Sequence, residues 1–227
     1  KKIVKKYLTA TILLFFFAPI TICISEEIKP NNIKFNVYRN NSLIGYHKIN
    51  FSSSKNLIQS DIEIKFEVTF LGFVVYEYFH KNSETWSENT LIKLNATTDK
   101  NGETLDCNFE KISDKFIIEG TLAEEMIYEP LIPTSYWNKI LVNDDNKKIL
   151  NTQDCSYIEF KITNLGKEKI YNDVLETSHY KLIGNESTGE IVDIDIWYNQ
   201  SSEWVKMIFL KDGSKIEYIL DEYDSKK

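Results

Sequence analysis

The stretch Ile62–Phe79, IEIKFEVTFLGFVVYEYF, decides the fold that the sequence predicts. In its first half, apolar residues at positions 62, 64, 66, 68 and 70 alternate with polar residues at positions 63, 65, 67 and 69. This period of two is typical of a β-strand that turns one face to a core and the other to water. Gly72 interrupts the run, and a glycine inside a strand often marks a bulge or bend. We therefore expect Gly72 either to curl one long strand or to divide the stretch into two strands.

The same rhythm recurs along the chain. Apolar residues occupy positions 192, 194, 196 and 198, and again positions 216, 218 and 220. Turn sequences such as Asn40-Asn41, Asn101-Gly102 and Asp212-Gly213 separate the runs. Asn-Gly and Asp-Gly accept the positive φ angles that a type I′ turn needs at both central residues. The pattern predicts antiparallel strands joined by hairpins.

Proline placement indicates where the sheet is interrupted. Proline is absent from residues 31–129 and 134–227, and Pro130 and Pro133 lie between these two stretches. Because proline removes a ladder donor, its absence favours two long meanders of strands, at 33–121 and 155–221. The segment 122–151 is expected to be a crossover with one short helix near 134–140, in which Thr134 or Ser135 is the N-cap.

Together these signals predict an all-β fold. We expect a single large curled antiparallel sheet, a half-barrel or open barrel of about eleven strands, within one β domain over residues 26–227. Many twisted strands in one sheet tend to curl, and a curled sheet encloses a concave face that is a natural place for a binding site.

The N-terminus has the form of an export signal. Four lysines among the first six residues precede an uncharged apolar run over residues 7–24, and two glutamates follow Ser25. This order predicts a signal peptide over residues 1–25 and a periplasmic location for the remainder. The alternatives are an uncleaved inner-membrane anchor, because 18 apolar residues approach the length of a span, and third a lipidated Cys23.

Composition restricts the possible partners. The net charge is −7, and it becomes −11 without the first 25 residues, which carry four lysines and no acid. An acidic body argues against nucleic-acid binding, which requires a basic face. Contact with a membrane is expected only through the N-terminal segment, if that segment is not cleaved.

Cysteine and histidine usage predicts neither a metal site nor a catalytic site. Cys107 and Cys155 could form a disulfide in an oxidising compartment, or remain two buried thiols. No CxxC or HxxxH spacing is present, so no metal or other cofactor is expected. The three histidines, His47, His80 and His179, are not accompanied by a GxSxG motif, and we predict no catalytic residues.

Four motifs resemble a family of uncharacterised bacterial exported proteins, a domain of unknown function. They are FNVYRNNSLIGYHKINF, LGFVVYEYFHKNSETW, TSYWN, and DIDIWYN with EWVKMIFLKDGSKIEYIL, within residues 33–221. The terminal pattern is also similar to the periplasmic half-barrels of the LolA/LolB lipoprotein carriers. The resemblance implies a half-barrel that carries a hydrophobic ligand, and it transfers no catalytic residue.

Aromatic residues are the remaining candidates for a binding site. We predict a groove for a lipid or acyl chain in the concave face, lined by Phe66, Phe70, Phe73, Tyr76, Tyr78, Trp86, Trp137 and Trp197. The alternative is an ordinary aromatic core, in which case the chain would be a non-catalytic envelope interaction or structural protein with an envelope protein as partner. A hydrolase is the third hypothesis.

Overall fold

A computed structural model describes residues 29–186, 189–211 and 213–226, so the predicted signal peptide lies outside the described residues. Fifteen strands and two short 3₁₀-helices make up this part of the chain. The strands are β1 (Ile33–Arg39), β2 (Ser42–Ser54), β3 (Leu57–Phe70), β4 (Phe73–Ser87), β5 (Thr90–Lys100), β6 (Glu103–Ile112), β7 (Lys115–Gly120), β8 (Glu124–Ile127), β9 (Ile132–Pro133), β10 (Asn146–Leu150), β11 (Tyr157–Ile170), β12 (Leu175–Asn185), β13 (Ile191–Asn199), β14 (Trp204–Lys211) and β15 (Ser214–Leu220). The helices are η1 (Lys139–Val142) and η2 (Asp221–Lys226).

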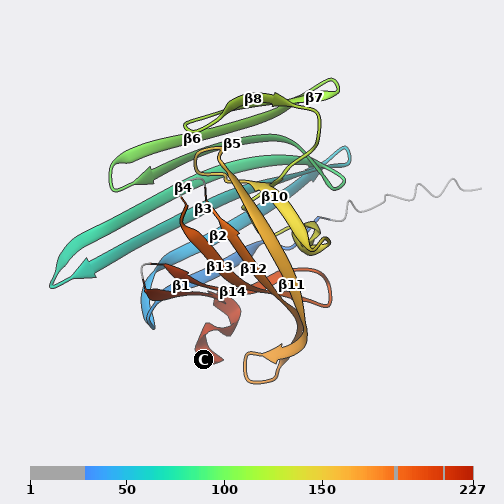
Figure 1. Cartoon of the computed structure of the whole chain (residues 1–227). Coiled ribbons are helices and arrows are strands. Elements are labelled where there is room, and N and C mark those ends of the chain that lie inside the picture. Colours follow the sequence, from blue (N-terminus) through green and yellow to red (C-terminus); the bar gives the residue numbers. More distant parts are fainter. Residues whose placement is uncertain (1–28, 187–188, 212, 227) are drawn as a thin grey trace, which may run out of the picture.

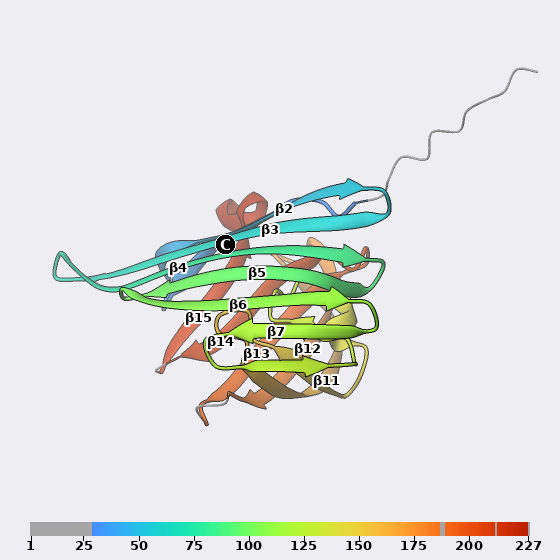
Figure 2. The same ribbon diagram turned by 90° about the horizontal axis from the view of Figure 1, so that it is seen from above.

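All fifteen strands belong to one sheet that remains open. Its order is β8-β7-β6-β5-β4-β3-β2-β1-β15-β14-β13-β12-β11-β10-β9, so β8 and β9 are the two edges. The two meanders meet in the middle, where β1 pairs antiparallel with β15 through Phe35↔Leu220. The sheet curls until its two halves face each other (Figures 1 and 2). The predicted all-β curled sheet is therefore confirmed.

The strand count differs from the prediction of about eleven, because the segment 122–151 is not a bare crossover. It contains three short strands, β8, β9 and β10. Strands of two to five residues carry too little periodicity to be recognised in a sequence. Pro133 lies in the edge strand β9, parallel to β10, where its missing N–H donor costs least.

The predicted helix is displaced and shorter. Residues 134–138 are not helical, and η1 begins at Lys139 with Asn138 as its N-cap, not Thr134 or Ser135. The Asn138 side chain accepts a hydrogen bond from the backbone N–H of Ile140 at 3.1 Å. Thr134 instead bonds through its hydroxyl to Thr152, because Thr134 N donates to Leu150 O at the end of β10 and so places Thr134 beside the residues that follow β10.

Gly72 divides the stretch that decides the fold into two strands. Leu71 and Gly72 have φ angles of 50° and 83°, and Phe70 pairs with Phe73 directly before and after them. Positive φ at both central residues characterises a type I′ turn, whose twist matches that of the flanking strands. The result is the hairpin β3–β4.

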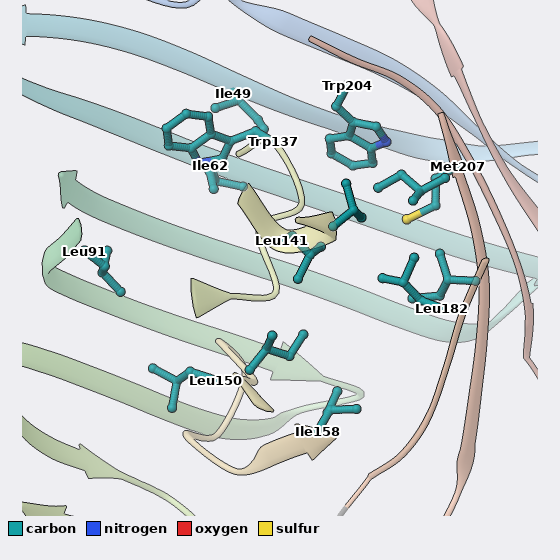
Figure 3. Packing of buried hydrophobic residues seen from close by; sticks show 14 of the residues in the cluster. Ile49, Ile62, Leu91, Trp137, Leu141, Leu150, Ile158, Leu182, Trp204 and Met207 are labelled. Atoms are coloured by element: carbon teal, nitrogen blue, oxygen red, sulfur yellow. The ribbon is translucent and has the colours of Figure 1, made fainter. Parts of the chain in front are cut away.

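The concave face of the sheet is filled by the protein's own side chains. Apolar residues from both meanders form one buried cluster, and the segment between β9 and β10 contributes Trp137 and Leu141 to it. Figure 3 shows these two residues between the strands of the two halves. Trp137 packs edge-on against Trp86 of β4 at 5.2 Å between ring centroids. The segment between β9 and β10, residues 134–145, therefore fills the space that the curled sheet encloses, and we call this segment the plug.

A disulfide joins the two ends of the open sheet. Cys107 of β6 pairs with Cys155, which lies between β10 and β11, with 4.9 Å between their Cα atoms. Gly120 leaves room for this bond, because a Cβ atom there would lie 2.5 Å from the Cys155 Cβ. A backbone hydrogen bond from Leu122 N to Asp154 O at 2.9 Å crosses the same gap. The seam is thus closed by a covalent bond rather than by a strand ladder.

The described part of the chain contains no helix long and apolar enough to cross a membrane.

Candidate functional site

The hairpin β3–β4 projects beyond the rest of the sheet. Pairing between β2 and β3 ends at Gly45↔Phe66, and pairing between β4 and β5 ends at Tyr78↔Lys100. Glu77 still bonds to Asn101 of the β5–β6 turn, through Asn101 N to Glu77 O at 3.0 Å and Glu77 N to Asn101 Oδ1 at 2.8 Å. Within the described sheet, residues 67–76 are therefore paired only within the hairpin β3–β4. Figures 1 and 2 show this tip reaching past the neighbouring strand ends, at the far left of Figure 2. At the rise of a β-strand the projection is about 13 Å long.

The side chains at this tip are apolar and exposed. Their exposed fractions are 65% for Phe70, 81% for Leu71, 74% for Phe73, 49% for Val74 and 54% for Val75. Phe70 and Phe73 are cross-strand partners and share one face of the hairpin, whereas Val74 follows Phe73 and lies on the other face. The tip is therefore apolar on both faces. We call residues 68–76, which include no charged side chain, the apolar tip.

Leu71 occupies a backbone conformation that suits asparagine better. Its φ of 50° lies in the left-handed region, which is uncommon for residues other than glycine, asparagine and aspartate. The comparable turns between β1 and β2 and between β5 and β6 place Asn40 and Asn101 at this position. Leu71 is 81% exposed, so it gains little burial within the described chain in return for this backbone energy, and such strain is found at functional positions.

A pair of acids ends the apolar tip. Glu67 faces Glu77 across the hairpin, and both are exposed. One step closer to the sheet, Phe66 stacks on Tyr78 with 5.4 Å between ring centroids, and burial raises the pKa of Tyr78 well above its usual range. The hairpin thus changes within a few residues from a packed base, through an acidic collar, to an exposed tip.

The eight aromatic residues predicted to line one groove lie in three different places. Phe70, Phe73 and Tyr76 belong to the apolar tip, and Phe66 and Tyr78 form its base. Trp86 and Trp137 are buried in the main core. Trp197 lies in a separate cluster with Ile170 and Val205. The structure therefore does not bring the predicted groove together, because the plug occupies the concave face and because β3 and β4 carry their aromatic ends out of it.

A buried carboxylate holds the plug in place. Glu84 of β4 is fully buried. Four side chains donate hydrogen bonds to it at distances from 2.7 to 3.1 Å: Ser60 Oγ, Asn82 Nδ2, Trp86 Nε1 and Trp137 Nε1. Burial raises the pKa of Glu84, and these hydrogen bonds oppose that effect because they stabilise the charged form. The bond from Trp137 ties the crossover to the sheet.

Two histidines are also buried on the inner face. His47 is packed among the rings of Phe35, Trp204 and Tyr218, and neither of its ring nitrogens has a hydrogen-bond partner. His80 Nδ1 lies 2.8 Å from the hydroxyl of Thr98. Burial lowers the pKa of His47 to about 3 and that of His80 to about 4. Both imidazoles are therefore neutral at pH 7.

The third histidine belongs to a polar cluster outside the core. His179 Nε2 lies 2.8 Å from Asp195 Oδ1, and Nδ1 lies 3.1 Å from Glu168 Oε2. Its ring stacks on Trp197 at 4.2 Å. Because both ring nitrogens face carboxylate oxygens and the ring is held against Trp197, this cluster has the form of a structural hydrogen-bonded network. Among the residues that the structure describes, no three His, Cys, Asp or Glu side chains converge as metal ligands would.

Shallow hollows occur on the polar outer face of the sheet. One, of about 420 Å³, is lined by Lys48, Asp61 and Glu63, among others, and another of about 420 Å³ by Lys147, Lys161 and Asn185. Both are lined by side chains of mixed charge on strands that already pair with one another. Neither resembles an apolar site for a lipid.

The sequence analysis gave Glu84 no role, and it assigned Phe70, Phe73 and Tyr76 to a concave groove rather than to an exposed tip. Glu84 shares its inward parity with His80, Asn82 and Trp86, so the rhythm of β4 places an acid on the inner face. This alternation was the feature of the sequence from which a buried position for Glu84 could have been predicted. The tip had a signal of its own: the charged residues that alternate with apolar ones up to Glu67 are absent from residues 68–76, so both faces of the strands become uncharged there.

Fold and site together define a class: an open, curled β-sheet protein with a filled interior, a disulfide across its seam and one projecting apolar hairpin. The chain belongs to the family described as Domain of unknown function (DUF6134), whose model matches residues 35–221. No curated protein matches the sequence significantly.

A solved structure shares the fold. The crystal structure of a beta-barrel-like protein of domain of unknown function DUF1849 from Brucella abortus is similar with a TM-score of 0.61, over 83% of this chain and 94% of that chain, at 5% sequence identity. At such low identity the likeness shows the fold alone.

Proposed function

We propose that this chain is an exported, non-catalytic protein of the bacterial cell envelope that docks onto a partner through its apolar tip. The observation that carries the proposal is the exposed apolar tip, on a sheet whose concave face is already filled. Exposed apolar patches on otherwise soluble domains mark interaction surfaces. The basic and apolar N-terminus supports export, and a disulfide is the kind of bond that persists outside the cytoplasm.

Photo-crosslinking in the producing cell tests this function. A benzoylphenylalanine replaces Phe73 at the tip and, in a matched control, Ser113 in the exposed turn between β6 and β7. We expect one reproducible adduct, to protein or to lipid, from position 73 and none from position 113. Equal labelling from both positions, or none from position 73, would show that the tip is not a docking surface.

A carrier of a hydrophobic ligand is the second candidate, and it is the function that similarity to the LolA/LolB carriers implies. The observation that favours it concerns the aromatic residues at the inner end of the plug, Tyr136 and Trp137, which are tied to the strands by one hydrogen bond each. Trp137 Nε1 donates to Glu84 at 3.1 Å, and the Tyr198 hydroxyl donates to Tyr136 O at 2.7 Å. A ligand would enter the concave face only after the plug moved out of it.

Mass spectrometry of lipid extracted from the purified protein tests the carrier hypothesis. A carrier is expected to yield a defined lipid and to take up a fluorescent fatty acid after delipidation. Protein without extractable lipid or uptake would contradict it and leave the docking function in place.

A further inference from the structure

We propose that the partner of the apolar tip is the surface of a lipid bilayer, into which the tip inserts. This inference rests on the proposed docking function and names its partner. It is separate from any membrane contact made by residues 1–25, because it concerns a hairpin of the folded domain.

The distribution of apolar side chains around the tip favours a bilayer. Phe70 and Phe73 lie on one face, Val74 lies on the other, and Leu71 is at the end. A protein partner that contacts one face of a hairpin leaves the other face in water, whereas hydrocarbon surrounds an inserted tip on every side. The tip carries no charged side chain over residues 68–76, so its transfer from water to the boundary between headgroups and acyl chains removes mainly apolar surface from water.

The length of the tip matches the depth of shallow insertion. Three residue steps separate the pair Phe70↔Phe73 from the pair Glu67↔Glu77, which corresponds to about 10 Å along the strands. Interfacial membrane-binding elements bury their apolar side chains about 5–10 Å into the boundary between headgroups and acyl chains. The acidic collar would then stay among the headgroups or in water, where its charges remain solvated.

Tyr76 lies at the level where a membrane interface favours tyrosine. It is half-buried and pairs with Val68, one step beyond the acidic collar toward the tip. Tyrosine combines an apolar ring with a polar hydroxyl, and it is enriched at the headgroup level of membrane proteins.

Charge determines which bilayer the tip should prefer. The collar is acidic, and the chain as a whole carries a net charge of −7. Anionic lipids would repel such a surface at low ionic strength. We therefore expect insertion through apolar contact into zwitterionic phosphatidylcholine vesicles, and weaker insertion when phosphatidylglycerol is added, with recovery as salt screens the repulsion.

An environment-sensitive fluorophore tests the insertion directly. In the full chain with Cys23→Ser, Phe73→Cys carries an NBD label, and Ser113→Cys carries it in the control; Cys107 and Cys155 are paired and do not react. We expect the emission at position 73 to rise severalfold and shift to the blue with vesicles, and to be quenched by spin labels on the acyl chains. The emission at position 113 should not change.

A second substitution separates tip insertion from general affinity for vesicles. Phe70→Ser, in the protein labelled at position 73, should raise the lipid concentration for half-maximal signal at least about tenfold, since a buried phenylalanine contributes strongly to transfer from water. Val174→Ser, which removes a similarly exposed apolar residue from the turn between β11 and β12, should leave it unchanged.

The outcomes distinguish the lipid inference from the docking function. No response of the label at position 73, together with one reproducible protein adduct from position 73 in cells, would overturn the bilayer as partner and keep the docking function. No response and no adduct would overturn both. Equal responses at positions 73 and 113 would show that the protein adsorbs without inserting its tip, which also overturns the inference.

Discussion

At the scale of single residues, Glu84 shows how one polar group can organise an apolar interior. A buried carboxylate is costly unless its oxygens are hydrogen-bonded, and here four donors surround it. One of these donors, Trp137, belongs to the plug, so the stability of the carboxylate and the position of the plug depend on each other.

Glu84→Gln should destabilise the fold by about 2–4 kcal/mol, because it places an amide donor against a set of donors that need an acceptor. Urea unfolding followed by fluorescence measures the loss, and the shielded Trp137 is expected to become accessible to acrylamide. Glu77→Gln, an exposed acid on the same strand, is the matched control and should change stability by less than about 0.5 kcal/mol. Equal effects of the two substitutions would contradict the role of Glu84.

His47→Phe should stabilise the protein by about 1–3 kcal/mol at pH 7, because it removes two buried ring nitrogens that have no partner and keeps the aromatic contacts. The gain should grow as the pH falls below about 6.5. In the unfolded chain His47 takes up a proton near pH 6.5, whereas burial keeps it neutral in the fold down to about pH 3.

The direction of this pH dependence of stability follows from the number of protons that the folded and unfolded states bind. Between these two pH values the unfolded state binds more protons, so the wild-type protein loses up to about 1.4 kcal/mol per pH unit through His47 as the pH falls. The His47→Phe variant lacks this contribution. Chemical unfolding at pH 7, 6 and 5 measures the difference, and a constant difference across this range would contradict the prediction.

At the scale of elements, the turn of the hairpin β3–β4 has different requirements for folding and for contact with a partner, and they conflict at Leu71. A type I′ turn favours Asn-Gly, but this turn is Leu71-Gly72. Asn40 and Asn101 follow this preference in two other two-residue turns of the N-terminal meander, whereas Lys55, Glu88 and Ser113 occupy the same position in the remaining three. Leu71 is the apolar side chain among these six and is 81% exposed, which favours contact with a partner rather than a role in folding.

Leu71→Asn should therefore raise the free energy of unfolding by about 1 kcal/mol, because asparagine tolerates the left-handed region better. The same substitution should weaken the response of the labelled tip to vesicles. Differential scanning calorimetry and the vesicle titration measure the two effects. Asn40→Leu is the reverse control in a comparable turn, where the Asn40 side chain bonds to Lys215 of β15, and it should destabilise without affecting vesicle binding. A Leu71→Asn protein that is less stable than wild type would contradict the turn assignment.

At the scale of the whole molecule, the open sheet depends on a bond across its seam. No strand ladder joins β8 to β9 in the described sheet, and Cys107–Cys155 connects the two meanders near those edges. The bond closes a loop with a sequence separation of 48 residues, so it restricts the unfolded chain considerably.

Replacing both cysteines by alanine should lower the free energy of unfolding by roughly 2–4 kcal/mol, since loop closure then no longer restricts the unfolded state. Urea unfolding of the oxidised protein, the reduced protein and the double variant measures it. Reduced wild-type protein should resemble the variant. A double variant as stable as the oxidised protein would show that the seam is closed by packing alone.

A substitution of Gly120 by alanine provides an independent check of this seam. The new Cβ would lie 2.8 Å from the Cys155 sulfur, so it should slow or prevent disulfide formation without removing either thiol.

The sequence by itself determined the class of fold. Period-two alternation requires pleated strands with one dry face, and the Asn-Gly type turns specify antiparallel neighbours, because both depend only on residues close together in the chain. This local information was sufficient for the curled all-β sheet, and it marked Gly72 as a bend or a division without deciding between the two. It was insufficient for the short strands β8 to β10 and for the start of η1, whose few residues carry almost no periodic signal.

Only the tertiary structure decided where each apolar surface lies. Trp137 and Phe73 are both aromatic residues in apolar surroundings of the sequence, yet one fills the concave face and the other projects beyond it. Burial depends on which segments distant in the sequence pack against each other in the fold. Trp137 of the plug contacts Glu84, 53 positions earlier in the chain. The strands beside β3 and β4, in contrast, end before the tip and leave it exposed. These long-range contacts are properties of the folded sheet, and the spacing of residues along one strand does not specify them.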